Sequence, residues 1–421
     1  MINPLKTRTV HAGNVLIGSG HPIVVQTMCN THTADVEATV AQCERLVKAG
    51  AQLIRITVPS LKDVPALEEI RRRVQADVPL VADIHFSAEV AMAVVPVVEK
   101  IRINPGNFHP NHEKARELFG ELLKKCKEYD RAIRIGLNHG SLGKYIVEKY
   151  GNTPQAMALA AMEWVQMCVE AEFYNVVVSL KASNTVVMVQ AYRELARMMQ
   201  EAGVVFPLHV GVTEAGNGDS GRIKSCVAIS TLLAEGIGNT IRVSLTEPPE
   251  NEIPVAQYLA KRYSDPSASG LRMTSACHSE RSEESILKAA CDWGGPLLNH
   301  EVDDIPLEDE YLKDEIMQAC RRRFYKPEYI ACPGCGRTLY DLENTFNKVK
   351  ERTGHFKDVV IAVMGCIVNC PGEMADADYG YVGEGFGKVT LYRKKDPVLR
   401  HIPEDEAVDK LVELITADRA K

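Results

Sequence analysis

Four cysteines and one glutamate near the end of the chain have the spacing of a metal or iron–sulfur site. Cys332 and Cys335 stand in the turn CPGC after a predicted strand, where both thiolates can face one centre. Cys366 and Cys370 follow a second predicted strand, in MGCIVNCPGE, and Glu373 ends the same turn. Such soft ligands from two turns suit zinc or iron. The exchangeable carboxylate of Glu373 favours an iron–sulfur cluster, whereas a four-cysteine zinc site stays an alternative.

A second set of chemistry-bearing residues lies within or just after short apolar strands and is mostly basic. Charged groups inside apolar strands are costly unless they face opposite charge, so together they indicate an anionic ligand with more than one charge, such as a diphosphate. A single arginine could instead be half of a structural ion pair with Asp83 or Glu214. The candidates at the predicted strand ends are Arg55, Asp83, His85, Arg102, Asn104, Arg134, Asn138, Lys181, Glu214, Arg242 and Ser244.

Two glycine-rich connections add backbone N–H donors to this set. GVTEAGNGDSGR follows the seventh predicted strand, and HGSLG follows the fifth. Glycines let backbone N–H groups approach an anion, and a helix that begins in such a loop can direct its N-terminus at the ligand. Although each loop alone could be a plain turn, both are predicted to help bind the anion.

These residues need a scaffold that brings many strand ends together. Eight β-rich runs alternate with amphipathic helical stretches. This alternation predicts an α/β fold of the (β/α)8, or TIM-barrel, class, whose active sites lie at the carboxyl ends of the strands. An open doubly wound sheet is the alternative, but no GxGxxG follows the first strand. The runs are 22–28, 52–58, 79–85, 100–104, 132–138, 175–181, 207–212 and 240–245.

The chain changes character after Tyr263. We expect a TIM-barrel substrate-binding domain over 1–264, a partly helical linker or insert over 265–325, and a smaller α+β iron–sulfur domain over 326–421. The polar run 276–285, ACHSERSEES, predicts a surface loop or disorder.

The composition of the chain excludes some classes of function. The 421 residues carry 49 basic and 56 acidic side chains, a net charge of −7, which argues against a general nucleic-acid-binding protein. No apolar run is long enough to cross a membrane, and the N-terminus lacks the apolar segment of a signal peptide, so we expect a cytoplasmic protein with no membrane partner. In a cytosolic chain, closely spaced cysteines indicate metal binding rather than disulfides.

Longer motifs carry a family resemblance. VQTMCNTHTADVEATV, VADIHF, RINPGN, IRIGLNHGSL, SLKAS, GVTEAG, ACPGCGRT and VMGCIVNCPGE occur in this order. Together they resemble the 4-hydroxy-3-methylbut-2-enyl diphosphate synthases, the ring-opening reductases of the methylerythritol phosphate route to isoprenoids. The resemblance covers most of residues 5–262 and 328–420.

The resemblance implies reductive ring opening of 2-C-methyl-D-erythritol 2,4-cyclodiphosphate, held in the barrel beneath a 4Fe–4S cluster. It implies ferredoxin or flavodoxin as electron donor and Glu214 and Glu373 as catalytic residues. The implied cluster ligands are Cys332, Cys335, Cys366 and Glu373. The implied substrate contacts, all found at predicted strand ends, are Arg55, His85, Arg102, Asn104, Arg134, Asn138, Lys181, Arg242 and Ser244.

Two departures from the family pattern matter. Many relatives have glycine at the position of Cys370, so this cysteine could compete with Glu373 for the cluster. The long middle domain of the plant branch is absent, and relatives without it dimerise head to tail. We therefore expect a homodimer in which one subunit's cluster covers the other's barrel. Two other functions stay as alternatives: a pterin-binding transferase with a similar barrel, and a zinc-ribbon protein that binds nucleic acid.

Overall fold

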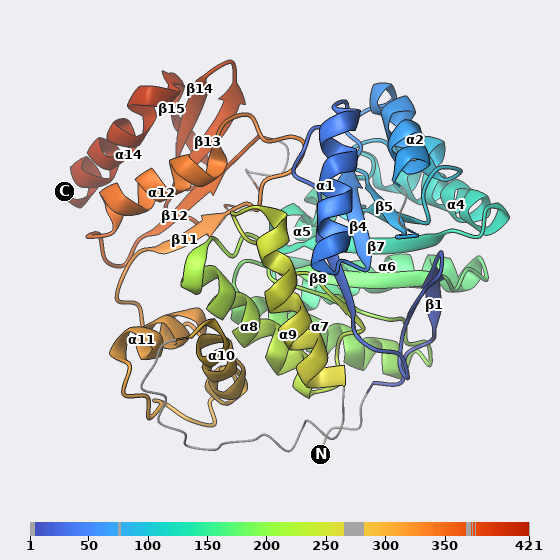
Figure 1. Ribbon diagram of the computed structural model, residues 1–421, viewed down its shortest axis with the longest axis horizontal. Helices are drawn as coiled ribbons and strands as arrows, with labels where there is room; N and C mark the ends of the chain where they lie inside the picture. The colour runs from blue at the N-terminus through green and yellow to red at the C-terminus, as the bar shows by residue number, and fades with distance from the viewer. Residues whose placement is uncertain are drawn as a thin grey trace.

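The computed structural model describes residues 5–74, 77–264, 282–367, 372, 374 and 376–420. Its larger part is the predicted barrel (Figure 1). All eight predicted strands form, in the parallel order β8-β7-β6-β5-β4-β3-β10-β9, and a bridge from Val178 to Leu208 closes the ring, which excludes the open sheet. The strands are β3 (Val24–Met28), β4 (Leu53–Thr57), β5 (Leu80–Asp83), β6 (Lys100–Ile103), β7 (Ala132–Asn138), β8 (Val176–Lys181), β9 (His209–Val210) and β10 (Thr240–Ile241).

Helices cover the outside of the barrel, and local sequence signals set their ends. At the first of them the Asp35 carboxylate accepts a hydrogen bond from the Ala38 N–H, and Gly50 ends the helix in the left-handed conformation. The helices are α1 (Val36–Ala49), α2 (Val64–Arg73), α3 (Ala88–Val94), α4 (His112–Glu128), α5 (Lys144–Tyr150), α6 (Pro154–Glu170), α7 (Thr185–Glu201), α8 (Gly218–Ala234) and α9 (Glu252–Ser264), with short 3-10 turns η1 (Leu61–Asp63), η2 (Pro105–Asn107), η3 (His139–Ser141) and η4 (Pro249–Asn251).

A hairpin that the sequence analysis did not predict covers the amino-terminal end of the barrel. In it β1 (Val10–Ala12) pairs with β2 (Val15–Ile17). Their buried side chains pack on apolar residues at the starts of the barrel strands, and the cluster comprises Val10, Ala12, Ile17, Val24, Leu53, Val81, Ala132 and Val177. The opposite end, where the strands finish, carries the predicted site residues.

Two helices of the predicted insert pack against the barrel beside α8 (Figure 1). They are α10 (Glu283–Leu298) and α11 (Glu310–Ala319). Gly294 lies so near α8 that a Cβ on it would be 2.8 Å from the Cα of Val227, so only glycine fits there. The loop prediction for 276–285 is wrong for its last three residues, which start α10 behind the N-cap Ser282; residues 265–281 lie outside the described part.

The last part is an α+β unit built on one sheet of order β11-β12-β13-β14-β15. The first three strands are parallel and the others antiparallel. Phe346 and Val349 on one helix and Leu411 and Ile415 on the other pack in its core. Strand β15 is not expected from the sequence. The elements of this unit are β11 (Glu328–Ala331), α12 (Leu342–Thr353), β12 (Val360–Met364), β13 (Tyr379–Gly385), β14 (Lys388–Arg393), β15 (Asp396–Pro403) and α14 (Glu404–Arg419).

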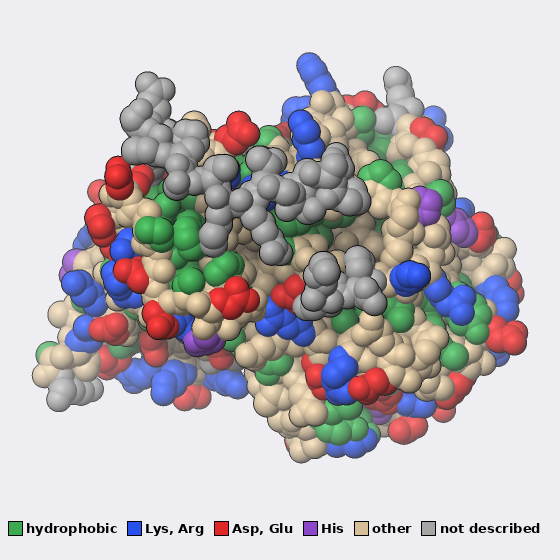
Figure 2. Space-filling view, turned by 90° about the horizontal axis from the view of Figure 1, so that it is seen from below, with side chains coloured by type: hydrophobic (Ala, Val, Ile, Leu, Met, Phe, Trp, Pro, Cys, Tyr) green, Lys and Arg blue, Asp and Glu red, His purple; other side chains and the backbone are tan. Residues whose placement is uncertain are grey.

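The C-terminal unit docks on the mouth of the barrel of the same chain. Ala331 bridges to Ala215, and a ring nitrogen of His32 lies 2.7 Å from the carbonyl oxygen of Gly336. We keep the division into 1–264, 265–325 and 326–421 as a proposal. None of the described helices is long and apolar enough to cross a membrane. Acidic and basic side chains are interspersed over the face drawn in Figure 2.

Candidate functional site

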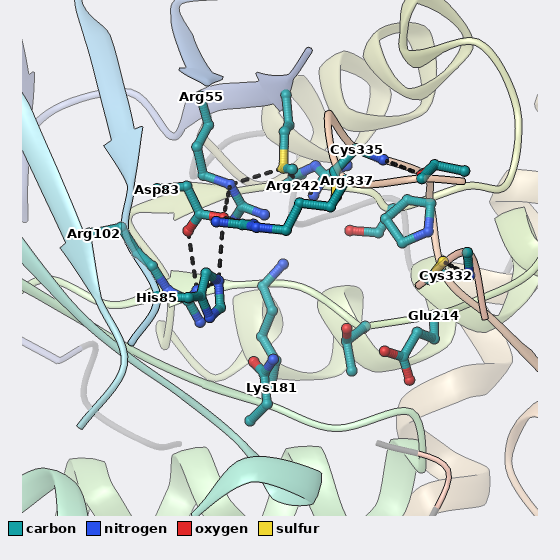
Figure 3. A pocket seen from close by; sticks show the side chains of 18 of the residues that line it. Arg55, Asp83, His85, Arg102, Lys181, Glu214, Arg242, Cys332, Cys335 and Arg337 are labelled. Carbon is teal, nitrogen blue, oxygen red and sulfur yellow. Dashed lines mark hydrogen bonds and ion pairs between the residues drawn. The ribbon is translucent and has the colours of Figure 1, made fainter. Parts of the chain in front are cut away.

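One pocket collects side chains from the barrel mouth and from the cysteine-bearing turns (Figure 3). The C-terminal domain contributes Cys332, Cys335, Arg337, Thr338 and Cys366. The barrel contributes Met28, Arg55, Asp83, His85, Arg102, Arg134, Asn138, Ser179, Lys181, Thr213, Glu214, Arg242 and Ser244. The structure thus brings the two predicted groups of residues into a single cavity.

Asp83, at the end of β5, is surrounded by basic groups. Its carboxylate oxygens lie 3.0 Å from Arg102 Nη1 and 3.8 Å from both Arg55 Nε and Arg337 Nη1. Burial by itself would raise the pKa of Asp83, but Arg55 and Arg102 hold that pKa well below its ordinary value. Asp83 therefore stays ionised and orients the guanidinium groups, yet one carboxylate cannot neutralise all of them.

Arg242 has a carboxylate partner of its own on α9. Its Nε and Nη2 lie 3.1 and 3.0 Å from the two oxygens of Glu252, and both side chains are buried. Thr27 also donates a hydrogen bond to Glu252. Because a bidentate contact fixes the guanidinium, the ion pair with Glu252 holds Arg242 in place in the wall of the pocket. The partner is Glu252, which the sequence analysis did not consider.

Arg134 and Lys181 are basic side chains without an ion pair to any described residue. Nε and Nη1 of Arg134 are buried and have no hydrogen-bond partner among the residues described. Burial lowers the pKa of both side chains well below the ordinary values, and the neighbouring arginines lower them further. Isolated buried cations are costly, so this part of the pocket is suited to an anion with more than one charge.

His85 follows β5 and lies between Asp83 and Arg102. Its Nε2 is 2.7 Å from Arg102 Nη1 and 3.3 Å from an oxygen of Asp83. Burial, together with the positive charge of Arg102, lowers the pKa of His85 to about 4, although Asp83 acts in the other direction. At neutral pH the imidazole is therefore uncharged and serves as a hydrogen-bonding group.

Glu214 lies in the loop after β9 and turns its side chain into the pocket below Cys332 (Figure 3). It is buried and has a φ of 56°, in the left-handed region that non-glycine residues rarely adopt. Such backbone conformations cost about 1–3 kcal/mol and cluster at functional sites. The main-chain carbonyl of Glu214 also accepts a hydrogen bond from the Ala331 N–H at 3.3 Å, which joins this loop to the C-terminal domain.

Cys332, Cys335 and Cys366 reach the pocket from two turns. The Gly365 N–H donates to Cys332 Sγ at 3.2 Å, and the Arg337 N–H donates to the Cys335 sulfur. Burial raises the pKa of both thiols, so their thiolates need a bound cation. Among the described residues no three His, Cys, Asp or Glu side chains could hold a single ion. A cluster, in which each thiolate binds its own iron, suits cysteine sulfurs that accept hydrogen bonds from backbone N–H groups.

Glu373 and Cys370 lie outside the described residues. Their neighbour Gly372 lies against the loop after β7, where a Cβ on it would be 1.6 Å from the carbonyl oxygen of Gly140. This position requires glycine, because any side chain would collide with the Gly140 backbone.

Asn104 is the one described candidate that does not line the pocket. Its side chain donates to Ser141 Oγ and accepts from the Gly106 N–H, so it shapes the loops after β6 and β7. The sequence analysis missed Met28, Ser179, Thr213, Arg337 and Thr338, which all line the pocket. For Arg337 the signal was available, since it follows Cys335 by two residues.

The glycine-rich loop before α8 does not offer that helix's N-terminus to a ligand. The Gly218 N–H donates to Glu247 Oε1 at 2.7 Å, and Arg222 Nη1 lies 2.8 Å from the same oxygen. The chain's own carboxylate therefore occupies the position that was predicted for a ligand anion. Only Thr213 and Glu214 of the loop reach the pocket.

Known proteins match this chain in sequence over almost its full length. Residues 7–257 match the family described as "GcpE TIM-barrel domain", and residues 328–417 match "GcpE protein C-terminal domain". A Gloeothece citriformis protein named 4-hydroxy-3-methylbut-2-en-1-yl diphosphate synthase (ferredoxin) is 43% identical over 99% of this chain and 94% of its own length. A Synechococcus protein of the same name is 44% identical over 98% of this chain and 91% of its own length.

Among solved structures, Yersinia pestis dihydropteroate synthase is similar to part of the chain. The match has a TM-score of 0.42 and 14% identity, and it covers 61% of this chain and 100% of that one.

Proposed function

The chain belongs to the family of 4-hydroxy-3-methylbut-2-en-1-yl diphosphate synthases, and we propose that the pocket between its barrel and its cysteine-bearing turns is the active site. It is an oxidoreductase of isoprenoid biosynthesis that opens the ring of 2-C-methyl-D-erythritol 2,4-cyclodiphosphate. Two electrons enter, one C–O bond breaks, and a hydroxyl leaves as water to give 4-hydroxy-3-methylbut-2-enyl diphosphate.

The observation that carries the site assignment is the shared pocket. Cationic side chains of the barrel mouth and three cysteines of the C-terminal domain line it together within one chain. A diphosphate provides the negative charge that the barrel cations lack, and cysteines beside it are suited to a redox centre.

The barrel side of the pocket binds and orients the cyclic diphosphate. Arg134 and Lys181 hold its charge, because they have no carboxylate contact of their own among the described residues. Arg102 is held at a fixed angle by Asp83 and by the carbonyl oxygen of Gly136, 3.0 Å from its Nη2. The remaining substrate contacts are Arg55, His85, Asn138, Arg242 and Ser244, with Asn104 shaping the adjoining loops.

A 4Fe–4S cluster held by Cys332, Cys335, Cys366 and Glu373 would supply the two electrons one at a time. Cys370 is the alternative to Glu373 as fourth ligand. Glu214 is placed beside Cys332 at the pocket wall and holds the proton that the leaving hydroxyl takes up as water. Its burial keeps bulk water from competing for that proton.

The partners follow from the same proposal. A ferredoxin, which is part of the names of the relatives given above, or a flavodoxin donates the electrons. We keep a homodimer and a cytoplasmic location as predictions. In this chain, however, the cysteine-bearing turns cover the barrel of the same chain, so a partner subunit is not needed to complete the pocket.

Anaerobic purification tests the proposal. The protein should be brown, contain about four irons per chain, and convert the cyclic diphosphate when reduced ferredoxin or flavodoxin is supplied. The Glu373→Ala variant should keep most of the iron but lose turnover. A colourless protein with one zinc per chain, or one that binds a pterin and not the cyclic diphosphate, would overturn it.

A further inference from the structure

Arg337 is a largely covered arginine that neither the barrel nor the predicted ligand set accounts for. It stands two residues after Cys335, and its side chain, only 10% exposed, extends across the pocket toward Asp83 (Figure 3). It thus brings a positive charge from the C-terminal domain to the basic groups of the barrel mouth. We propose that Arg337 binds the diphosphate of the substrate from the side of the cysteine turn and positions it against that turn; this rests on the proposed function.

The guanidinium of Arg337 is incompletely paired. Its Nη1 lies 3.8 Å from Asp83, beyond hydrogen-bond distance, and its Nη2 is buried with no hydrogen-bond partner among the described residues. A buried guanidinium N–H without a partner is costly. Phosphate oxygens accept from arginine in a bidentate manner, so a diphosphate in this pocket satisfies the donor that Asp83 leaves unused.

Arg337 competes with other basic groups for Asp83. The carboxylate already has Arg102 at 3.0 Å and His85 at 3.3 Å, which are both closer than Arg337. Arg337 is therefore among the most weakly held of the basic groups around Asp83. An entering anion with more than one charge can attract the Arg337 side chain with little loss of interaction with Asp83.

The turn that carries Arg337 has a fixed position on the barrel. The Gly336 carbonyl lies 2.7 Å from His32 Nδ1, and a Cβ on Gly336 would be 2.6 Å from the carbonyl oxygen of Thr31, so the turn packs directly on the barrel. The Arg337 N–H donates to the Cys335 sulfur. One residue therefore contacts a cluster ligand through its backbone and faces the substrate site through its side chain.

A purely structural latch between Arg337 and Asp83 is the competing explanation, and substrate affinity separates the two. Binding of the cyclic diphosphate is measured by calorimetry on iron-loaded enzyme without a reductant, so that no turnover occurs. In Arg337→Gln the Kd should rise at least tenfold with unchanged iron content, and Arg337→Lys should recover part of the loss. In assays KM should rise more than kcat falls.

The matched controls are Arg352→Gln and Arg134→Gln. Arg352 is an exposed arginine of the same domain, 2.6 Å from Asp409, and its variant should bind like wild type. If Arg134→Gln weakens binding but Arg337→Gln binds within twofold of wild type, the site is right and the role of Arg337 is wrong. If neither changes affinity, the proposed site itself fails. If Arg337→Gln loses iron, substrate binding is compared between cluster-free wild type and cluster-free variant instead. Equal Kd values for the cyclic diphosphate would again reject the role of Arg337 in substrate binding.

Discussion

The hydroxyl of Thr246 donates a hydrogen bond to the main-chain carbonyl of Cys332, with 2.9 Å between the two oxygens. Thr246 follows the eighth barrel strand, and Cys332 is the first cysteine of the C-terminal domain of the same chain. Two further contacts start from α8: Ser220 Oγ lies 2.8 Å from Glu315 of α11, and Lys224 Nζ lies 3.2 Å from Glu328 of β11. The barrel helix α8 therefore helps to hold the C-terminal domain, and with it the cysteine turns, over the barrel of the same chain.

This arrangement predicts that each active site is completed within one chain. Glu214→Gln and Cys335→Ala, each inactive alone, should not restore activity when co-expressed with different tags. In a head-to-tail dimer that exchanges domains, one of two sites would be intact, and the doubly tagged species would show about half of the wild-type activity. The measurement is turnover of doubly tagged protein.

Two controls make that result interpretable. Doubly tagged wild type must be active, and each variant must retain its fold by circular dichroism. If no doubly tagged species can be isolated, the chain is a monomer, and its site is again formed within one chain. Activity near half of wild type would show that subunits exchange domains.

Arg134 and Arg242 should respond differently to the same substitution. Arg242→Met leaves Glu252 as a buried carboxylate without its partner and should destabilise the protein by about 3–5 kcal/mol. Arg134→Met removes a cation with no ion pair to a described residue, so stability should hold or increase while substrate Kd rises at least tenfold. Urea unfolding and substrate calorimetry measure the two effects, and equal losses of stability would contradict this distinction.

The same two arginines show how far the sequence could predict the site. Strand periodicity placed both at the barrel mouth, because the spacing of apolar and polar residues determines which side of a strand faces inward. Which one pairs with Glu252 could not be predicted, since Glu252 lies on α9 and meets Arg242 only in the folded barrel. Likewise the capping of α8 by Glu247 is a tertiary contact that the glycine-rich motif does not encode.

The missed elements have local causes. Prolines at both ends of β15, Pro397 and Pro403, and the exposed charges between them resemble a loop, yet an edge strand tolerates both. The hairpin of β1 and β2 has strands of three residues, too short for a periodicity to be recognised. The run ACHSERSEES is mostly polar and low in complexity, which predicts a loop. Its Ser282, followed by two glutamates, is nevertheless an N-cap signal, and a helix begins there.

His85 should make stability depend on pH below neutrality. Its pKa is about 4 in the folded protein, below the ordinary value of 6.5, so between these pH values the unfolded chain binds a proton that the folded protein does not. Stability is therefore lost as the pH falls from 6.5 toward 4, by about 3 kcal/mol from this group. His85→Gln should flatten that slope. The urea midpoints of iron-loaded wild type and of iron-loaded His85→Gln at pH 4.5 and 7.5 measure the two slopes. Identical slopes for the two proteins would refute the lowered pKa of His85.

Lys100 should lower the stability of the fold at neutral pH. It lies on β6 two residues before Arg102, and so on the same inward face; it is fully buried, and its Nζ has no hydrogen-bond partner among the described residues. Burial, and then Arg134, lower its pKa well below the ordinary value. At neutral pH the unfolded chain binds a proton that this site disfavours, so stability rises with pH toward the ordinary lysine pKa.

Lys100→Met should therefore stabilise the protein by about 1–3 kcal/mol at pH 7, and this gain should shrink as the pH approaches 10. The methionine side chain has about the length of the aliphatic part of lysine and lacks the ammonium group, so packing in the barrel is largely preserved. Lys388→Met, at an exposed position on β14, is the matched control and should change stability by less than about 0.5 kcal/mol. Urea midpoints at both pH values give the comparison. A Met variant that is less stable at pH 7 would mean that the ammonium group holds the barrel interior together, because only a stabilising contact could outweigh the cost of burying it.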